Sequence, residues 1–316
     1  MKPQTPMKHQ EHTKPKEEKA APRVDTLLVS VVVATIGRDD LLIDTITRLL
    51  ECDYDPFEVV VVDQTPEPSD RVRRFMDEHR SVVRYIHKDT PGLPEARNDG
   101  IRESRGDIVL FVDDDVVADT GLIAAHAGTY REEGIVGVAG RVLPPGDSHG
   151  GTGVKPRHIA KIRHFGLVIR DNFDADVKTP AHHVRGCNMS FRRKVLRDAG
   201  GFDARFGGSA HLEETDLAVR VRNAGGRLVF EPAARLLHLL EPVGGCRPKN
   251  LKDWFEWYGH NFALFYLKNF PKALFPVYAL YYFAKLPFSA VKNGSIGVIL
   301  WGFVGFFRGI RTYRRG

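Results

Sequence analysis

Residues 106–117 read GDIVLFVDDDVV, and this stretch decides the fold prediction. Its apolar part, Ile108–Val112, is unbroken and short, which is typical of a strand buried between two layers of helices. Three consecutive carboxylates, Asp113, Asp114 and Asp115, follow it. Because like charges at the end of a buried strand repel one another, we expect a positively charged partner at this point of the fold.

A divalent cation is one candidate for that partner. Residues two apart in a strand point the same way, so Asp113 and Asp115 are expected to converge on one ion. Hard oxygen ligands suit Mg2+ or Mn2+, which leave coordination positions open for substrate phosphates. The alternative is a solvated acidic turn, because a short acidic motif needs structural context before it indicates a site.

The preceding sequence supplies that context through alternating strands and helices. Apolar, Val-rich runs predict strands at residues 26–34, 57–62, 82–87 and 108–112, and helical spacing predicts helices at 39–50, 70–80 and 95–104. This order predicts an α/β fold with a Rossmann-like, mostly parallel sheet flanked by helices, whose ligands bind at the carboxyl ends of the strands. Thr35, Asp63 and the acidic triplet all lie at such ends, which favours a site over a solvated turn.

After residue 119 the sequence predicts regular elements first and then a long irregular segment. A helix is expected at residues 120–133 and a strand at 134–142. Residues 144–181 are rich in Gly, Pro and charge, and we interpret them as an irregular, partly mobile loop that faces the substrate.

A further helix is expected to begin near Glu213. Its buried side is Leu217, Val219 and Val221, and Asp216 and Arg220 are spaced to pair on its surface. Acids are common in first turns because the helix dipole favours negative charge there. Glu213 and Glu214 are therefore not evidence of a site by themselves.

Composition places the basic charge at one end of the 316-residue chain. The net charge is +6, yet the residues after Glu256 carry eight Lys or Arg and no acid, so the preceding residues sum to −2. This argues against a nucleic-acid partner for the body and for an anionic surface near the tail. The cysteines, Cys52, Cys187 and Cys246, match neither a zinc spacing nor a disulfide framework, which favours a reducing cytoplasm.

Three regions follow: a disordered tail at 1–25, a globular domain at 26–245, and a membrane-associating helical region at 246–316. Aromatic residues recur at helical spacing over 251–270, and residues 296–307 are apolar for only 12 positions. Since a spanning helix needs about 20 apolar residues, we favour amphipathic helices lying in an anionic leaflet over a true span. An exposed face for oligomerisation is the alternative. The expected location is the cytoplasmic face of the cell membrane, as a peripheral or monotopic protein.

Several motifs occur in a recognisable order. They are Thr35, Asp63, residues 92–98 (GLPEARN), the acidic triplet, residues 200–203 (GGFD), residues 213–217 (EETDL) with Arg220, and His238. Their order and spacing resemble the family 2 inverting glycosyltransferases of the GT-A fold, of the membrane-associated bacterial type, over about residues 27–240. The resemblance implies transfer of a sugar from a nucleotide-diphosphate-sugar donor to an acceptor hydroxyl, with a saccharide or a lipid-linked acceptor of envelope polysaccharide as the second substrate.

The resemblance also implies roles in binding the nucleotide. Residues matching Thr35 and Asp63 hold the base and the ribose, and Asp114 lies beside the ribose. Arg97 matches a basic position near the nucleotide, where it faces the diphosphate or orients the acidic strand. A surface salt bridge on a helix is the alternative for Arg97.

Metal binding and catalysis are assigned by the same resemblance. Asp113 and Asp115 match the Asp-x-Asp metal motif, and His238 matches a histidine that completes the metal site in some relatives, although a lone histidine is often only packed. The family's Glu-Asp pair aligns with Glu213-Glu214, which makes Glu214 the expected general base, with Glu213 as the other candidate. A single displacement without an enzyme nucleophile implies inversion.

Two other functions remain open at this point. A nucleotidyltransferase can share this architecture and its metal carboxylates, but it needs a strong basic signature in the first strand–helix loop, where Arg38 stands alone. A non-catalytic, membrane-bound nucleotide-sugar binding module would not need intact Asp113, Asp115 and Glu214. No Gly-x-Ser-x-Gly elbow and no Walker loop occur in the sequence.

Overall fold

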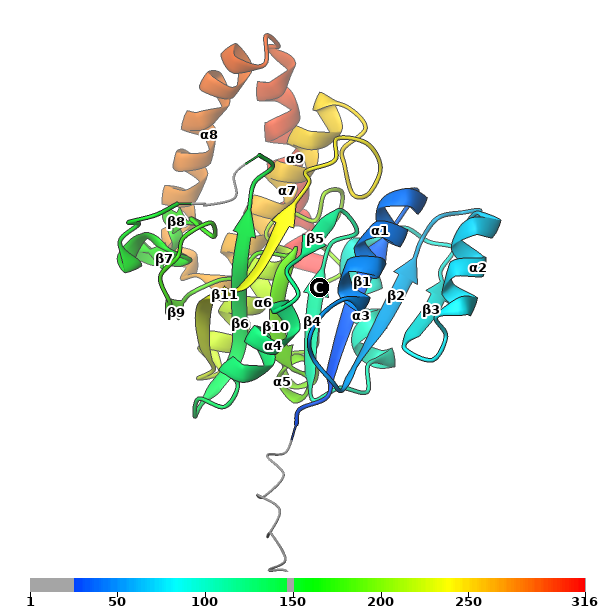
Figure 1. Ribbon diagram of the computed structural model, residues 1–316. Helices are drawn as coiled ribbons and strands as arrows, with labels where there is room; N and C mark the ends of the chain where they lie inside the picture. The colour runs from blue at the N-terminus through cyan, green and yellow to red at the C-terminus, as the bar shows by residue number, and fades with distance from the viewer. Residues whose placement is uncertain (1–25, 147–150, 316) are drawn as a thin grey trace, which may run out of the picture.

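The chain forms a mixed sheet covered by helices, with a helical hairpin extending beyond one end of it (Figure 1). The computed structural model describes residues 26–146 and 151–315, so the predicted disordered tail at 1–25 lies outside the described residues. The main sheet has the order β3-β2-β1-β4-β10-β6-β11-β5, and β9 pairs with β11. The strands are β1 Val29–Thr35, β2 Phe57–Asp63, β3 Val83–His87, β4 Ile108–Val112, β5 Val116–Ala118, β6 Ile135–Leu143, β9 Thr179–Ala181, β10 Asn188–Arg192 and β11 Arg227–His238.

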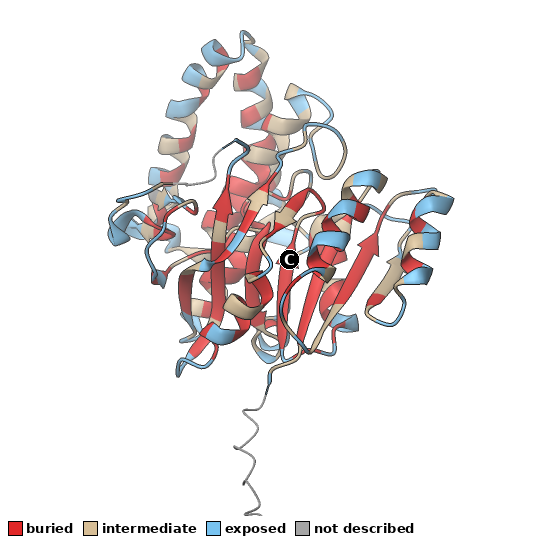
Figure 2. Ribbon diagram, viewed as in Figure 1, coloured by how far each residue is buried: buried red, intermediate tan, exposed pale blue. Residues whose placement is uncertain are grey.

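The first four strands confirm the predicted parallel half of the sheet. β1 lies between β2 and β4, and all three are parallel. Their Val-rich side chains are almost wholly buried, as expected for strands with helices on both faces (Figure 2). In the register, Thr35 lies opposite Asp63, and Val33 lies opposite Val112, the last residue of β4. The residues that end these strands therefore meet at one edge.

The second half of the sheet mixes directions. β10 is antiparallel to both β4 and β6, whereas β6 and β11 are parallel. Short β5 pairs antiparallel with the end of β11, placing His238 opposite Val116. Because the acidic triplet connects β4 to β5, it lies where the two halves of the sheet meet. The fold is the predicted α/β class.

Helices cover both faces of the sheet and form the C-terminal region. They are α1 Asp39–Leu50, α2 Asp70–Glu78, α3 Leu93–Glu103, α4 Leu122–Thr129, α5 Arg193–Asp198, α6 Glu213–Asn223, α7 Leu251–Asn269, α8 Phe275–Lys292 and α9 Gly297–Arg315. The predicted helix at 120–133 is shorter than expected, because Tyr130 caps α4 and a turn follows.

The insert at 144–181 contains more regular structure than predicted. Strands β7 (Lys161–Arg163) and β8 (Val168–Arg170) form a separate antiparallel hairpin, and β9 adds to the main sheet beside β11. The interpretation of the whole insert as irregular is therefore wrong. Each of these three-residue strands has only one or two apolar residues beside charged residues or Pro. A run this short has too little periodicity to predict a strand.

The C-terminal helices pack onto the domain through a second hydrophobic core. Phe206, Leu212 and Val219 of the body contribute to this core together with large aromatic residues of α7, α8 and α9. Helices α7 and α9 lie so close that a Cβ on Gly305 would overlap the backbone of Glu256. The tail is thus joined to the domain along the length of α7.

One buried network anchors α7 to α6. Asp216 accepts hydrogen bonds from Arg220, at 2.9 Å, and from Asn269, at 2.7 Å, and Lys268 lies 2.9 Å from it. Asp216 is fully buried, so the prediction of a surface pair with Arg220 is wrong. The sequence could not reveal this, because the two partners on α7 come about 50 residues later.

Exposed apolar residues gather on the α8–α9 hairpin. Nine of the fourteen large hydrophobic residues exposed in the described chain belong to it: Val277, Leu280, Phe288, Val291, Ile296, Leu300, Phe303, Val304 and Phe307. Residues Lys272–Lys292 form one helical stretch long and apolar enough, by length and composition, to cross a membrane. In Figure 2 the exposed positions recur along the outer side of α8.

Candidate functional site

The acidic triplet is a bend between β4 and β5, and its three carboxylates do not point the same way. Asp113 and Asp115 lie with His238 in a cluster whose candidate ligand atoms are all within 4.8 Å of one another. The predicted convergence of the two aspartates is therefore found. Its predicted reason is wrong, because residues 113–115 are not in a strand and the bend brings the two side chains together.

Asp114 turns into the body of the domain. Its carboxylate accepts hydrogen bonds from the hydroxyl of Thr35, at 2.6 Å, and from Nη1 of Arg38, at 2.8 Å. Its backbone carbonyl accepts a hydrogen bond from Thr45 on α1. Burial raises the pKa of Asp114 to about 6, against the opposing effects of Thr35 and Arg38. Both carboxylate oxygens of Asp114 thus have partners from the loop and strand at the first β–α connection.

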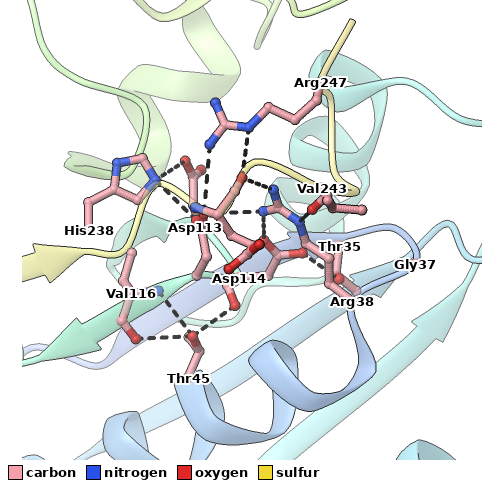
Figure 3. A network of polar contacts seen from close by, with 12 residues as sticks. Thr35, Gly37, Arg38, Thr45, Asp113, Asp114, Val116, His238, Val243 and Arg247 are labelled. Carbon is pink, nitrogen blue, oxygen red and sulfur yellow. Dashed lines mark hydrogen bonds and ion pairs between the residues drawn. The ribbon is translucent and has the colours of Figure 1, made fainter. Parts of the chain in front are cut away.

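Arg38 is the cation that the acidic triplet requires, although its sequence position alone is only weak evidence for this role. Besides Asp114, its Nη1 lies 3.3 Å from Asp115. Its other nitrogens donate to the carbonyls of Val243, at 2.9 Å, and Glu241, at 3.0 Å, so that the guanidinium is surrounded by oxygens (Figure 3). The chain itself therefore offsets much of the charge for which an ion was expected.

His238 closes the other side of the cluster. Its Nε2 lies 3.0 Å from Asp115, and the Cys187 thiol is a second neighbour of the ring. Burial alone would lower the pKa of His238, but Asp115, and after it Cys187 and Asp113, raise it to about 10. Two carboxylates and one imidazole form a donor set that suits Mn2+ and accommodates Mg2+. The residues present therefore fit the predicted metal.

Asp63 lies at the same sheet edge but has partners of its own. Its carboxylate accepts hydrogen bonds from the backbone of Thr65, at 2.8 Å, and from the hydroxyl of Tyr85, at 2.7 Å. Asp63 and the next residue, Gln64, are both buried, and of the two it is Gln64 that lines the cavity beside the acidic triplet. In this conformation Asp63 shapes the loop after β2, and its role toward a base stays a prediction.

Arg97 joins the acidic triplet to the start of α6. Its guanidinium pairs with Glu213 and lies 3.2 Å from Asp113, and it donates to the carbonyl of Gly186 at 3.0 Å. A Cβ on Gly186 would lie 2.9 Å from Nη2 of Arg97, so this close approach needs glycine. Arg97 and Glu213 are both buried. The alternative of a surface salt bridge is therefore wrong, and Arg97 holds the acidic end of β4 in place.

Glu214 lies next to that pair in the sequence but faces a different space. It lines a cavity of about 540 Å³, which we call the Glu214 cavity, whose walls come from the insert, α6, α7 and α8. Burial raises the pKa of Glu214, Arg97 lowers it, and Asp171 and Asp113 raise it further. Of the two candidate bases, Glu213 is occupied by Arg97 and Glu214 is open to a ligand.

Two cavities adjoin the acidic triplet on the other side. A cavity of about 180 Å³ is lined by Asp113, Asp114, Asp115 and His238, and a larger one of about 720 Å³ extends from it under Gly92 and Trp254. Both are lined by residues 245–248, which include Arg247. The guanidinium of Arg247 lies 3.8 Å from Asp115. The two cavities therefore have room for a ligand with several phosphate oxygens, and Arg247 offers that ligand a positive charge.

Arg247 and Gln64 line the site but are not predicted from the sequence, and neither is the importance of Arg38. Arg38 could have been found from its place in the loop after a strand, beside Thr35. For Arg247 the sequence carries no signal, because 132 residues separate it from Asp115 and the intervening chain is not periodic.

The comparisons with known proteins agree with this geometry. The model of glycosyl transferase family 2 matches residues 30–200. A glucosyl-dolichyl phosphate glucuronosyltransferase from Haloferax volcanii is 28% identical over 221 residues, covering 67% of this chain and 69% of the relative. A pre-mycofactocin glycosyltransferase from Mycobacterium tuberculosis is 28% identical over 201 residues, covering 62% of this chain and 39% of the relative.

Solved structures are similar in fold. A mannosyltransferase from Pyrobaculum calidifontis, PcManGT, in complex with GDP-Man and Mn2+, has a TM-score of 0.56 at 16% identity, covering 92% of this chain and 88% of that one. TarS from S. aureus has a TM-score of 0.58 at 17% identity, covering 89% and 78%. Since the family model spans more than half of the chain, the chain belongs to glycosyl transferase family 2, and its predicted GT-A fold and sugar-transfer function are confirmed.

Proposed function

We propose that this chain transfers a sugar from a nucleotide-diphosphate-sugar donor to an acceptor hydroxyl, with inversion at the anomeric carbon. The observation that carries the proposal is the arrangement around Arg97. This residue ties Asp113, in the Asp113–Asp115–His238 cluster, to Glu213, the residue before Glu214. The ion pairs of Arg97 with Asp113 and Glu213 thus lie between a candidate donor cavity, lined by Asp113, and a candidate acceptor cavity, lined by Glu214.

The donor is assigned to the cavities beside the acidic triplet. Asp113, Asp115 and His238 would hold Mg2+ or Mn2+. When bound, the ion supplies positive charge that offsets the charge of the departing nucleoside diphosphate. Arg247 is a second cation for the diphosphate. Thr35, Asp63 and Asp114 are assigned to the nucleoside, as the family pattern implies.

Glu214 is the proposed general base. It takes the proton of the acceptor hydroxyl while that oxygen attacks the anomeric carbon, and the bond to the donor phosphate breaks on the opposite face. Its raised pKa suits a base that works near neutral pH, because a stronger base accepts the proton more readily. One displacement, with no enzyme nucleophile, inverts the configuration.

A lipid-linked acceptor at a membrane is the proposed second substrate. The relative from Haloferax volcanii is named for a glucosyl-dolichyl phosphate acceptor. The exposed apolar residues of α8 and α9 offer a surface that would enter a lipid layer, and α8 also lines the Glu214 cavity. We assign the chain to the cytoplasmic face of the cell membrane, with residues 246–316 as its membrane-associating region.

The stereochemistry of the product tests the proposal. The protein is incubated with an α-configured nucleotide sugar, Mn2+ and a glycolipid acceptor, and the new linkage is identified by its anomeric proton coupling in NMR. A β-linked product and release of a nucleoside diphosphate are expected. An α-linked product contradicts the single displacement, and pyrophosphate release would indicate the nucleotidyltransferase alternative. Donor binding without any product would indicate the binding module.

A further inference from the structure

Arg185 is a half-buried cation that lines the Glu214 cavity, and its side chain is unpaired among the described residues. Its guanidinium forms no hydrogen bond and no ion pair with any residue in the described part of the chain. Arg38 and Arg97, by contrast, are surrounded by oxygens. A guanidinium presents five fixed N–H donors and matches the geometry of phosphate and carboxylate oxygens. In Arg185 these donors are available to a ligand.

The contacts of Arg97 with Gly186 and Glu213 bring Arg185 into the same cavity as the proposed base, Glu214. Gly186 binds Arg97 through its carbonyl, and the residue before it, Arg185, faces the cavity. Glu213 binds Arg97 through its carboxylate, and the residue after it, Glu214, faces the cavity. Two separate chain segments are thus fixed by one guanidinium, and each presents a charged side chain to the same space.

A second cation reaches this cavity from the membrane-facing hairpin. Lys285 of α8 lines it, with Nζ 3.9 Å from the centre of the Tyr281 ring and hydrogen-bonded to the Tyr281 hydroxyl. No carboxylate pairs with Lys285 within residues 26–146 and 151–315, where Tyr281 is its partner. Burial lowers the pKa of the nearby His211 to about 4, so this histidine adds no charge at neutral pH. Among the described residues, the acids that line the cavity are Glu214 and the exposed Asp171.

We propose that the Glu214 cavity binds the phosphate group of a phosphorylated saccharide acceptor through Arg185 and Lys285. This inference rests on the proposed function, because it takes Glu214 as the base that faces the acceptor hydroxyl. At about 540 Å³ the cavity is large enough for a sugar and its phosphate. The phosphate belongs either to a lipid-linked saccharide, whose chain would lie along the apolar α8, or to a free sugar phosphate.

Calorimetric titration of the full chain with three probes tests this inference. The probes are glucose 1-phosphate, its decyl phosphodiester, and neutral decyl glucoside. We expect both phosphates to bind and decyl glucoside to bind at least about tenfold more weakly, because a charge-assisted contact to phosphate is lost. Arg185→Gln should weaken both phosphates by about 10- to 100-fold, and Lys285→Gln should weaken them in the same direction. Arg185→Lys should recover part of the affinity.

The matched control is Arg48→Gln, which removes an exposed arginine from α1 and should leave all three probes unchanged. Tighter binding of the diester than of glucose 1-phosphate identifies a lipid-linked source, and equal binding identifies a free sugar phosphate. The inference is overturned if decyl glucoside binds as tightly as the phosphates. Unchanged phosphate binding in both Arg185→Gln and Lys285→Gln overturns it as well.

A parallel titration with nucleoside diphosphates and Mn2+ separates this inference from the proposed function. If a nucleoside diphosphate binds normally to Arg185→Gln while phosphate binding is lost, both stand. If it binds normally and phosphate binding is unchanged, the phosphate site fails alone. If no nucleoside diphosphate binds to the wild type, the proposed function fails, while binding of glucose 1-phosphate that depends on Arg185 still supports the phosphate site.

Discussion

Arg97 on α3 and Glu213 at the first position of α6 form a buried ion pair across 116 residues of sequence. The pair fixes the start of α6 against the acidic end of β4, because the same guanidinium reaches Asp113. One oxygen of Glu213 has no hydrogen-bond partner in the part of the chain that the structure describes, so Arg97 is what offsets the charge of this buried carboxylate. The arrangement leaves Glu214, and not Glu213, facing a cavity.

The first prediction separates these two glutamates. Glu214→Gln should keep the fold and donor binding but lower the transfer rate by about 10²-fold or more, because a general base contributes on that scale. Glu213→Gln should lower the free energy of unfolding by about 3–5 kcal/mol, because it leaves the buried charge of Arg97 without its main partner. Thermal melting and initial rates of the two variants check both statements.

Two outcomes would contradict the assignment of the base. One is a rate loss confined to Glu213→Gln with an unchanged melting temperature, which would make Glu213 the base. The other is full activity in Glu214→Gln. Glu132→Gln serves as a control, because Glu132 is an exposed carboxylate that pairs with Lys178 and lines neither the Glu214 cavity nor the two cavities beside the acidic triplet.

The second prediction concerns pH. Burial, Asp171 and Asp113 raise the pKa of Glu214 above its usual 4.5, and Arg97 opposes them. Since the base must be deprotonated to act, the rate should fall as the pH drops through this raised pKa. Asp171→Asn removes one of the charges that raise it, so the acid limb of the rate profile should move to lower pH. Low ionic strength is needed, because Asp171 is exposed and salt screens it.

Asp176→Asn is the control for this profile, since Asp176 is an exposed acid in the same insert and is not among the groups that shift Glu214. An acid limb that stays in place or moves to higher pH in Asp171→Asn would show that another group limits the rate.

The third prediction addresses the metal. Asp115→Asn should remove most of the binding of Mn2+, measured by electron paramagnetic resonance of the free ion, because it takes one of the two carboxylates from the cluster with His238. Asp119→Asn changes a carboxylate four residues away that pairs with Arg235, and it should bind Mn2+ as the wild type does. Equal Mn2+ binding by wild type and Asp115→Asn would remove Asp115 from the metal site.

The fourth prediction tests attachment to membranes. Phe288 and Ile296 are 79% and 81% exposed at the end of the α8–α9 hairpin. Replacing either one by Glu should lower partitioning onto lipid vesicles by at least about tenfold, since burying such a side chain contributes about 1.5–3 kcal/mol. Val177→Glu changes an exposed apolar residue outside the hairpin and should have no effect.

Co-sedimentation with phosphatidylcholine vesicles, with and without phosphatidylglycerol, measures this partitioning. Tighter binding to the anionic vesicles would support the prediction that the basic tail binds an anionic membrane surface. Equal binding would indicate that apolar contacts alone attach the protein to the vesicles. If Phe288→Glu and Ile296→Glu bind vesicles as well as the wild type, the hairpin is not the attachment site.

The parallel half of the sheet could be predicted from the sequence because each of its strands is a short, largely apolar run. Residues 26–34, 57–62 and 108–112 are Val-rich runs that end on polar residues, and the carboxyl ends of parallel strands share one edge. The convergence of Asp113 and Asp115 was predicted for the wrong reason, since strand alternation does not continue past Val112. The proximity of His238 came from the family pattern.

The remaining features depend on contacts between distant segments. Asp216 was assigned to a surface pair, although α7 buries it through Lys268 and Asn269. Arg247 reaches the acidic triplet only because residues 241–248 fold back onto the loop after β1, where they contact Ile36 and Arg38. Lys268 also shows why counting charge in the tail overstated its basic surface, because this lysine faces the body.

Thermal stabilisation by nucleoside diphosphates, with and without Mn2+, tests the central claim most directly. The account predicts that one nucleoside diphosphate raises the melting temperature in the presence of Mn2+, that the shift disappears with EDTA, and that it persists in Glu214→Gln. It would be contradicted by a panel of all common nucleoside diphosphates that gives no shift with Mn2+. A shift that is the same with Mn2+ and with EDTA would contradict the assignment of Asp113, Asp115 and His238 to the metal.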